Sequence, residues 1–133
     1  MKQTLKKYSS LFLRIGLACA FLSNSLQAFL APHEFINLLS NSFVIHFVPV
    51  SVTAFVHFIA FSDGMVFLLL ILGVYTEYVA IYGGLWLIGV MMTLGIHHYG
   101  DILEHLAFFS IAVYLMLNGS DVCSVTKTKY KGL

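Results

Sequence analysis

The densest group of potentially reactive side chains lies near residue 100, where His97 and His98 are followed by Asp101, Glu104 and His105. If a helix begins near Asp101, then Asp101 and His105 are one turn apart on one face and can reach the same ion. His97 or His98, on the preceding turn, could supply a third ligand. Imidazole suits zinc, copper, iron or haem. The group therefore predicts a metal or haem site formed by His97, His98, Asp101 and His105.

Two other interpretations fit the same residues. The histidines could lie at the headgroup level of a membrane and bond lipid phosphate and loop backbone, with Asp101 and Glu104 as helix caps. They could also handle protons or sense pH, because imidazole titrates near neutrality. Under the metal interpretation, His33 or His46 could add a ligand from another loop.

Asp63 is the second candidate, because it lies between Ser62 and Gly64 in the middle of a long apolar stretch. A charged carboxylate at the bilayer centre costs roughly 2.5–3.5 kcal/mol, so this side chain should face other helices and have a partner. The available partners are Asn24, Gln27, His57 and Thr93. A functional interpretation makes Asp63 a proton relay or, with His57, a contact for a cofactor. A structural interpretation makes it a polar clasp between helices.

The composition predicts the elements that must position these residues. The chain is 133 residues long, 59% hydrophobic and only 10% charged, with a mean hydropathy of +0.90, so lipid must surround most of it. About 20 apolar residues in a helix cross a bilayer. The predicted membrane-spanning helices are 10–31, 52–75, 77–95 and 101–118. Short turns after the second and third helices make neighbours antiparallel, which predicts an all-α, integral membrane four-helix bundle.

Residues 35–48, between the first and second spans, are too polar to cross a membrane and too apolar to be solvated freely. Apolar side chains alternate here with Asn37, Ser40, Asn41 and Ser42. We interpret the segment as an interfacial helix or re-entrant stretch that ends near Pro49. On the first span, a polar stripe should face the bundle rather than lipid. Its members are Cys19, Ser23, Asn24 and Gln27.

The seven Lys and Arg residues all lie at the ends of the chain, and none lies between Arg14 and Lys127. Four spans with cationic ends fit the positive-inside rule, so residues 1–9 and 120–133 are predicted to be cytoplasmic and the histidines to lie at the opposite face. The alternative is a cleaved signal peptide, since Lys6 and Lys7 precede an apolar run and a cleavage-like Ala28. The segregated charges give no case for nucleic-acid binding.

Arg14 lies one turn inside the first span, where it can extend its side chain to the headgroups. The alternative is an ion pair with Glu77, which should lie at the same face and would tie the first helix to the next hairpin. Phosphate-binding glycine loops, nucleophile elbows and CxxC pairs are all missing from the sequence, so unaided hydrolytic or dithiol chemistry is not expected.

Three short motifs resemble the DoxX family of small four-helix bacterial membrane proteins. Arg14-Ile15-Gly16-Leu17 resembles the start of its first helix. Asp63-Gly64, followed by an aliphatic run and Gly73, resembles its second helix. Asp101-Ile102, followed by Ala112-Val113-Tyr114-Leu115, resembles its fourth. The family more often has Glu on the second helix and Thr-Arg where this chain has Thr76-Glu77. The resemblance implies a four-helix bundle and a membrane component of redox systems, because relatives include a subunit type in thiosulfate:quinone oxidoreduction.

These observations lead to one main hypothesis and two alternatives. The main one is a multi-pass subunit or anchor of a redox or metal-handling system in the bacterial inner membrane. Asp63 and the outer His/Asp group would contact a quinone, haem, transition metal or partner, and the partner would be a membrane or periplasmic protein or a second copy. One alternative is a small proton- or metal-coupled transporter or permeation accessory that uses Asp63. The other is a structural assembly subunit without a site.

Overall fold

The computed structural model of the chain describes residues 2–95, 98–119 and 122–126, and all regular structure within these ranges is helical. The helices are α1 (Lys2–Leu30), α2 (Pro32–Ser40), the short 3-10 helix η1 (Phe43–Phe47), α3 (Val52–Leu72), α4 (Thr76–Leu94) and α5 (Tyr99–Asn118). The predicted all-α bundle is therefore confirmed. Four segments are long and apolar enough to cross a membrane: Tyr8–Leu30, Val52–Leu72, Thr76–Leu94 and Tyr99–Asn118. The chain is a multi-pass membrane protein.

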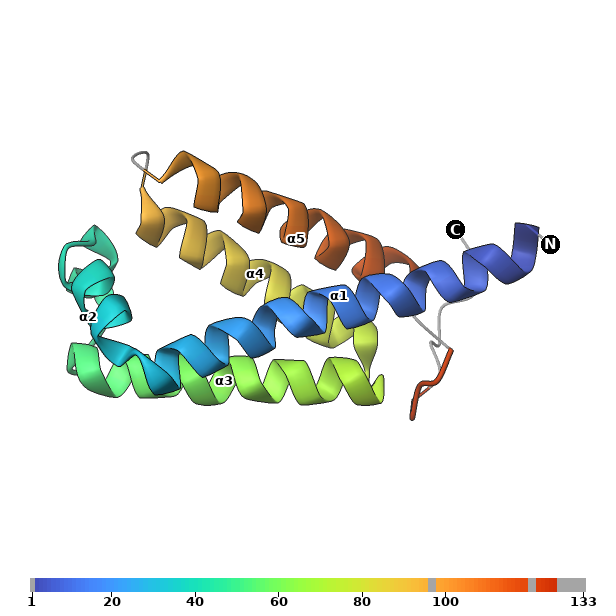
Figure 1. Ribbon diagram of the computed structural model, residues 1–133, viewed down its shortest axis with the longest axis horizontal. Coiled ribbons are helices and arrows are strands. Elements are labelled where there is room, and N and C mark those ends of the chain that lie inside the picture. Colours follow the sequence, from blue (N-terminus) through green and yellow to red (C-terminus); the bar gives the residue numbers. More distant parts are fainter. Residues whose placement is uncertain (1, 96–97, 120–121, 127–133) are drawn as a thin grey trace.

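The long helices form two close pairs (Figure 1). α1 packs along α3, α4 packs along α5, and α1 also contacts α5, whereas the consecutive helices α3 and α4 contact each other much less. The central apolar core between the pairs contains Leu17 and Phe21 of α1, Leu70 of α3, Leu87 of α4 and Leu115 of α5. The weak contact between α3 and α4 leaves room along that side of the bundle.

The connection between the first two spans folds into α2 and η1 at one end of the bundle (Figure 1). Pro32 lies in the first turn of α2, where its missing N–H costs no hydrogen bond. Ser42 begins η1 by accepting a hydrogen bond from the backbone N–H of Val44. Leu39 of α2 is buried against Val56 at the start of α3. The predicted segment 35–48 therefore comprises two short helices, and Leu39, with Phe35 and Ile36 packed beside it, anchors them to the bundle.

Several helix ends differ from the prediction. α1 continues back to Lys2 because Lys and Gln are good helix formers, a property that hydropathy does not register. α3 ends at Leu72 because Gly73 adopts a left-handed φ of 64°, and Tyr75 is also left-handed at 45°. Thr76 is consequently the first residue of α4 and not its cap.

The start of α5 also differs. α5 begins at Tyr99, so Asp101 lies in its first turn, and His98 occupies the cap position without a side-chain cap bond. Asp101 therefore suits the positive end of the helix dipole without acting as the predicted N-cap. The proposed capping box with Glu104 is not formed, since both residues lie inside the helix.

Segment 122–126 packs against the turn between α3 and α4. The backbone N–H of Val125 donates to Leu72 O over 3.0 Å, and the Thr126 hydroxyl accepts from Tyr75 N over 2.6 Å. These bonds satisfy groups that the end of α3 leaves without helical partners. The C-terminal segment is thereby fixed at the end of the bundle opposite α2.

Arg14 on α1 is hydrogen-bonded to segment 122–126. Its side chain is only 1% exposed, and its guanidinium donates to Ser124 Oγ over 2.6 Å and to Cys123 O over 2.9 Å. No ion pair between Arg14 and Glu77 is found in the described part of the chain. The predicted pair is corrected accordingly, because the guanidinium is turned toward the C-terminal segment.

Candidate functional site

Asp63 lies in the middle of α3 and is completely buried, with an exposed fraction of 0%. Asn24 of α1 donates from Nδ2 to Asp63 Oδ2 over 3.1 Å. Of the four partners that the sequence offered, Asn24 is the one in hydrogen-bond contact. Thr93 donates instead to Gly89 O within its own helix, and His57 is exposed and bonds Thr53 O. The carboxyl group thus faces the bundle, as its cost in lipid requires.

The second oxygen of Asp63 is less well satisfied. Asp63 Oδ1 and Trp86 Nε1 are both buried without a hydrogen-bond partner among the described residues. The Trp86 side chain lies beside the Asp63 carboxyl. Its ring stacks on Tyr82, with centroids 6.2 Å apart, and lies edge-on to Phe58. A buried acid thus lies beside an aromatic cluster with one donor and one acceptor still available.

A polar cleft of about 680 Å³ lies next to this acid, between α1, α2, α4 and α5. The whole predicted polar stripe of α1 lines it: Cys19, Ser23, Asn24 and Gln27. Glu34 from α2 and Asp101, Glu104 and His105 from α5 also line it. The described part of the chain contributes no Lys or Arg to this lining. The cleft is therefore acidic, and its wall includes the amide that holds Asp63.

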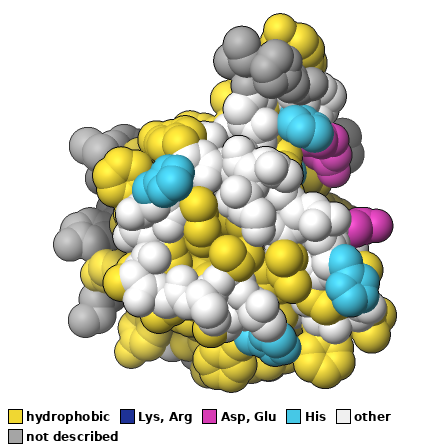
Figure 2. Space-filling view, turned by 90° about the vertical axis from the view of Figure 1, so that its left-hand side faces the viewer, with side chains coloured by type: hydrophobic (Ala, Val, Ile, Leu, Met, Phe, Trp, Pro, Cys, Tyr) yellow, Lys and Arg dark blue, Asp and Glu magenta, His cyan; other side chains and the backbone are white. Residues whose placement is uncertain are grey.

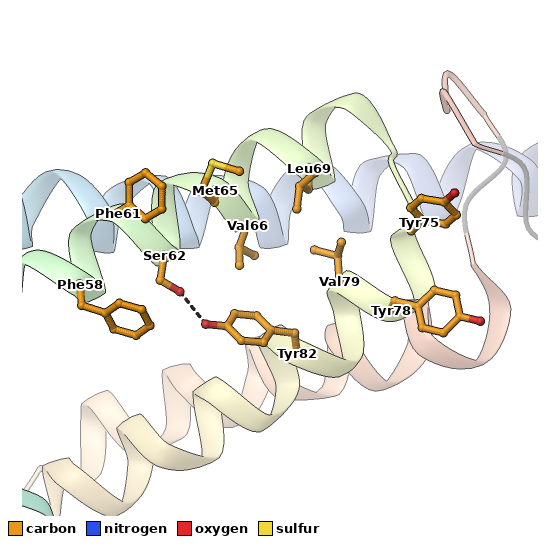
Figure 3. A pocket seen from close by; sticks show the side chains of 10 residues that line it. All are labelled: Phe58, Phe61, Ser62, Met65, Val66, Leu69, Tyr75, Tyr78, Val79 and Tyr82. Carbon is orange, nitrogen blue, oxygen red and sulfur yellow. Dashed lines mark hydrogen bonds between the residues drawn. The ribbon is translucent and has the colours of Figure 1, made fainter. Parts of the chain in front are cut away.

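A second, apolar cavity of about 620 Å³ lies between α3 and α4, where the two helices contact each other least. Figure 3 shows its lining, with Phe58 and Phe61 toward one end and Tyr75 and Tyr78 at the other. The Ser62 and Tyr82 hydroxyls in this lining are joined by a hydrogen bond of 2.6 Å (Figure 3). Because both helices span the membrane, we refer to this cavity as the lateral groove.

Asp63 connects these two cavities through its neighbours. Ser62 lines the lateral groove, whereas Asp63, the next residue, bonds Asn24 on the wall of the cleft. Trp86, beside Asp63, stacks on Tyr82, which also lines the groove. The Asp63 carboxyl group thus lies between the polar cleft and the apolar lateral groove. This meeting point is the candidate functional site.

The outer histidine group does not converge in the same way. His98 Nδ1 lies 3.4 Å from Asp101 Oδ2, but both side chains are about half exposed. His105 Nδ1 is 2.7 Å from the backbone oxygen of Asp101, so that nitrogen does not point to a shared ion. His97 lies outside the described residues. Within the described residues, no three His, Cys, Asp or Glu side chains are arranged to hold a metal ion.

The face that carries α2 bears histidines spread over its surface, with no Lys or Arg visible among its described atoms (Figure 2). His33 lies in α2, His46 in η1, His57 near the start of α3, and His105 near the start of α5. The histidines visible in this view are separated by yellow apolar side chains and by white backbone and other side chains (Figure 2). The described histidines therefore share one end of the bundle without forming a cluster.

Sequence reasoning missed the aromatic part of the site. Tyr82 and Trp86 are one helix turn apart, a spacing that favours ring contact, but hydropathy alone gives no reason to single them out. Ser62 was noted only as a neighbour of Asp63. The functional assignment thus depends on Asp63, the cleft and the lateral groove, and the DoxX resemblance stays a prediction. Comparison of the chain with protein-family models, with curated proteins and with solved structures finds no match.

Proposed function

We propose that the chain is a DoxX-like subunit of a redox system in the bacterial inner membrane, and that it binds a lipid-soluble quinone in the lateral groove. One observation carries this proposal. The groove lies between two membrane-spanning helices, is lined almost wholly by apolar side chains, and has the Ser62–Tyr82 hydroxyl pair along it. A ligand that reaches it from the bilayer meets apolar surface with a local polar contact.

The lining residues suit the parts of such a molecule. A quinone supplies electron and proton carriage through the bilayer, and its ring oxygens accept hydrogen bonds. Of the Ser62 and Tyr82 hydroxyls, the one that accepts their mutual hydrogen bond can donate its own proton to a ring oxygen, and Phe58 offers an aromatic face. Met65, Leu69 and Val79 line the rest of the groove and suit an isoprenoid tail. Trp86 stacks on Tyr82 and lies beside Asp63, so it borders the groove without lining it.

The proposed orientation places the two ends of the chain in the cytoplasm and the α2 end at the periplasmic face. The positive-inside rule supports it, since the cations lie at the chain ends and the described histidines lie at the opposite end. We further propose a membrane or periplasmic protein partner that exchanges electrons with the quinone. The exposed histidine face offers such a partner hydrogen-bonding groups.

Quinone binding to purified protein tests the proposal. Protein in mild detergent is titrated with a short-tail quinone, and binding is followed by quenching of Trp86, the single tryptophan. Wild-type protein should show saturable quenching, and Ser62→Ala with Tyr82→Phe should weaken affinity about tenfold, equivalent to one hydrogen bond of about 1.4 kcal/mol. Ser110→Ala is the matched control, because its hydroxyl bonds only Leu106 O in its own helix. Quenching that does not saturate, or equal affinity in all variants, would contradict the proposal.

A proton- or ion-coupled transporter is the second candidate, and the acidic cleft beside Asp63 favours it. An acid within a membrane that contacts a polar cavity is typical of coupled transport. Proteoliposomes with an imposed pH gradient would test it through solute-dependent proton flux. This flux should disappear in Asp63→Asn, and flux that survives the substitution unchanged would exclude Asp63 as the coupling group.

A further inference from the structure

We propose that the polar cleft is an aqueous path by which Asp63 exchanges protons with the solution on the α2 side of the membrane. The inference concerns a different cavity from the quinone proposal and does not depend on it. It assigns a function to the α1 polar stripe, which the groove leaves unexplained. It also assigns the side of the membrane from which protons reach Asp63, because α2 and the first turns of α5 line the cleft.

The size and lining of the cleft support the presence of water. Its volume of about 680 Å³ far exceeds what a single water molecule occupies, and polar groups from α1, α2 and α5 line it. Apolar cavities in proteins stay dry, whereas polar ones of sufficient size are hydrated. Glu34 lies in the first turn of α2 and Asp101 in the first turn of α5, so the acidic part of the lining is at the α2 end. Water there is continuous with the solution on that side.

The charges around the cleft favour protons over anions. Among the described residues, three carboxylates and no Lys or Arg line the cleft, and such a negative lining raises the local concentration of cations. Among the described residues, the titratable groups that line the cleft are Cys19 on α1, Glu34 on α2, and Asp101, Glu104 and His105 on α5. His57 on α3 and Tyr82 on α4 lie outside its lining. Arg14 does not line the cleft and is bonded to segment 122–126.

Asn24 is the last group between the cleft and the acid. It lines the cleft and is partly exposed, while its amide donates to the fully buried Asp63. A rotation of the Asn24 side chain would let one water molecule reach Oδ2. In the exchange step, the Asp63 carboxylate takes a proton from hydronium to give a carboxylic acid and water, and the reverse step returns it. Asn24 is therefore a positioning residue that controls access.

Cys19 is a native reporter for water in the cleft. It lines the cleft near the middle of α1, and Cys123 can be changed to Ser so that one thiol remains. In sealed proteoliposomes, a membrane-impermeant thiol reagent added on the α2 side should label Cys19, and the same reagent on the opposite side should not. Leu26→Cys, in a chain without native cysteines, is the control. Leu26 lies nearer the α2 end, is 47% exposed and does not line the cleft, so it should react more slowly.

Infrared difference spectroscopy tests the proton step itself. A drop in pH on the α2 side should produce the C=O band of a protonated carboxylic acid. Asp63→Asn should remove this band, and Asp63→Glu should shift it. Asn24→Gln should change the rate of this signal while keeping its size, whereas the lipid-side substitution Leu26→Ala should leave both unchanged. Unlabelled Cys19, or an Asp63 band that responds only to the opposite side, would overturn the inference. Loss of quinone binding would leave both readouts intact, so the two proposals fail separately.

Discussion

Asn24 on α1 donates a hydrogen bond from Nδ2 to Oδ2 of Asp63 on α3 over 3.1 Å, and it joins the two helices at the most deeply buried acid. The next residue, Ser25, donates to Ala60 O over 2.7 Å. Two consecutive residues of α1 thus bond the same helix. Because Asn24 also lines the polar cleft, one side chain both stabilises the helix pair and bounds the proposed proton path.

Replacing Asn24 with Leu should destabilise the bundle by about 1–2 kcal/mol, because it removes the one hydrogen bond to a carboxyl group that remains buried. Gln27→Leu is the matched control, since Gln27 lines the same cleft but is exposed. Unfolding in mixed micelles with increasing denaturing detergent measures both. Equal stability changes in the two variants would show that the Asn24–Asp63 bond contributes nothing specific.

The Phe21 side chain of α1 packs its ring against Gly83 of α4. A Cβ at this position would lie 3.1 and 3.2 Å from ring atoms of Phe21, which is itself buried. At Gly89 on the same helix a Cβ would meet nothing within 4 Å. Gly89→Ala should therefore stabilise the protein by about 0.5–1 kcal/mol through helix propensity, and Gly83→Ala should destabilise it by about 1 kcal/mol or more. Thermal unfolding in detergent checks the sign, which should differ between the two.

The turn after α3 requires glycine for two reasons. Gly73 has φ 64°, and a Cβ there would collide with Ser124 and with the Arg14 guanidinium. Gly95 has a φ of 65° but a ψ of 176°, a backbone region that is essentially restricted to glycine, and a Cβ there would meet nothing nearby. Gly95→Ala should therefore cost about 1–3 kcal/mol of backbone strain alone, whereas Gly73→Ala should cost about 1–2 kcal/mol for its left-handed backbone and more for the collision. If thermal unfolding in detergent shows that Gly73→Ala costs no more than its backbone strain, segment 122–126 does not pack against Gly73 as described.

Much of the fold could be predicted from hydropathy, because the apolar runs that contain Asp63 and Trp86 are long enough to cross a bilayer. The polar stripe of α1 was also correctly placed, since its helical spacing indicates one face. The choice of Asn24 over Gln27 or Thr93 as partner could not be made, because helix rotation and neighbours are set by long-range packing. The lateral groove could not be predicted either, because it arises from the separation of two helices that the sequence joins by a short turn.

Arg14 should control the order of segment 122–126. Arg14→Gln removes the donors to Ser124 and Cys123 O, so the Val125 amide, bonded to Leu72 O, should exchange with deuterium faster. Arg14→Lys retains the charge but not the planar pair of donors, and exchange should again be faster. Mass spectrometry of the C-terminal peptide measures the rate. Wild-type exchange in Arg14→Lys would mean that charge alone holds the segment.

Photo-crosslinking with an azido-substituted quinone in native membranes tests the central claim most directly, because it locates the ring. The account predicts crosslinked peptides from α3 and α4 around Phe58, Ser62 and Tyr82, with labelling that unmodified quinone suppresses. Ser62→Ala with Tyr82→Phe should reduce the yield, and Ser110→Ala should not. Labels distributed over all four spans, or label that unmodified quinone does not displace, would contradict a quinone site in the lateral groove.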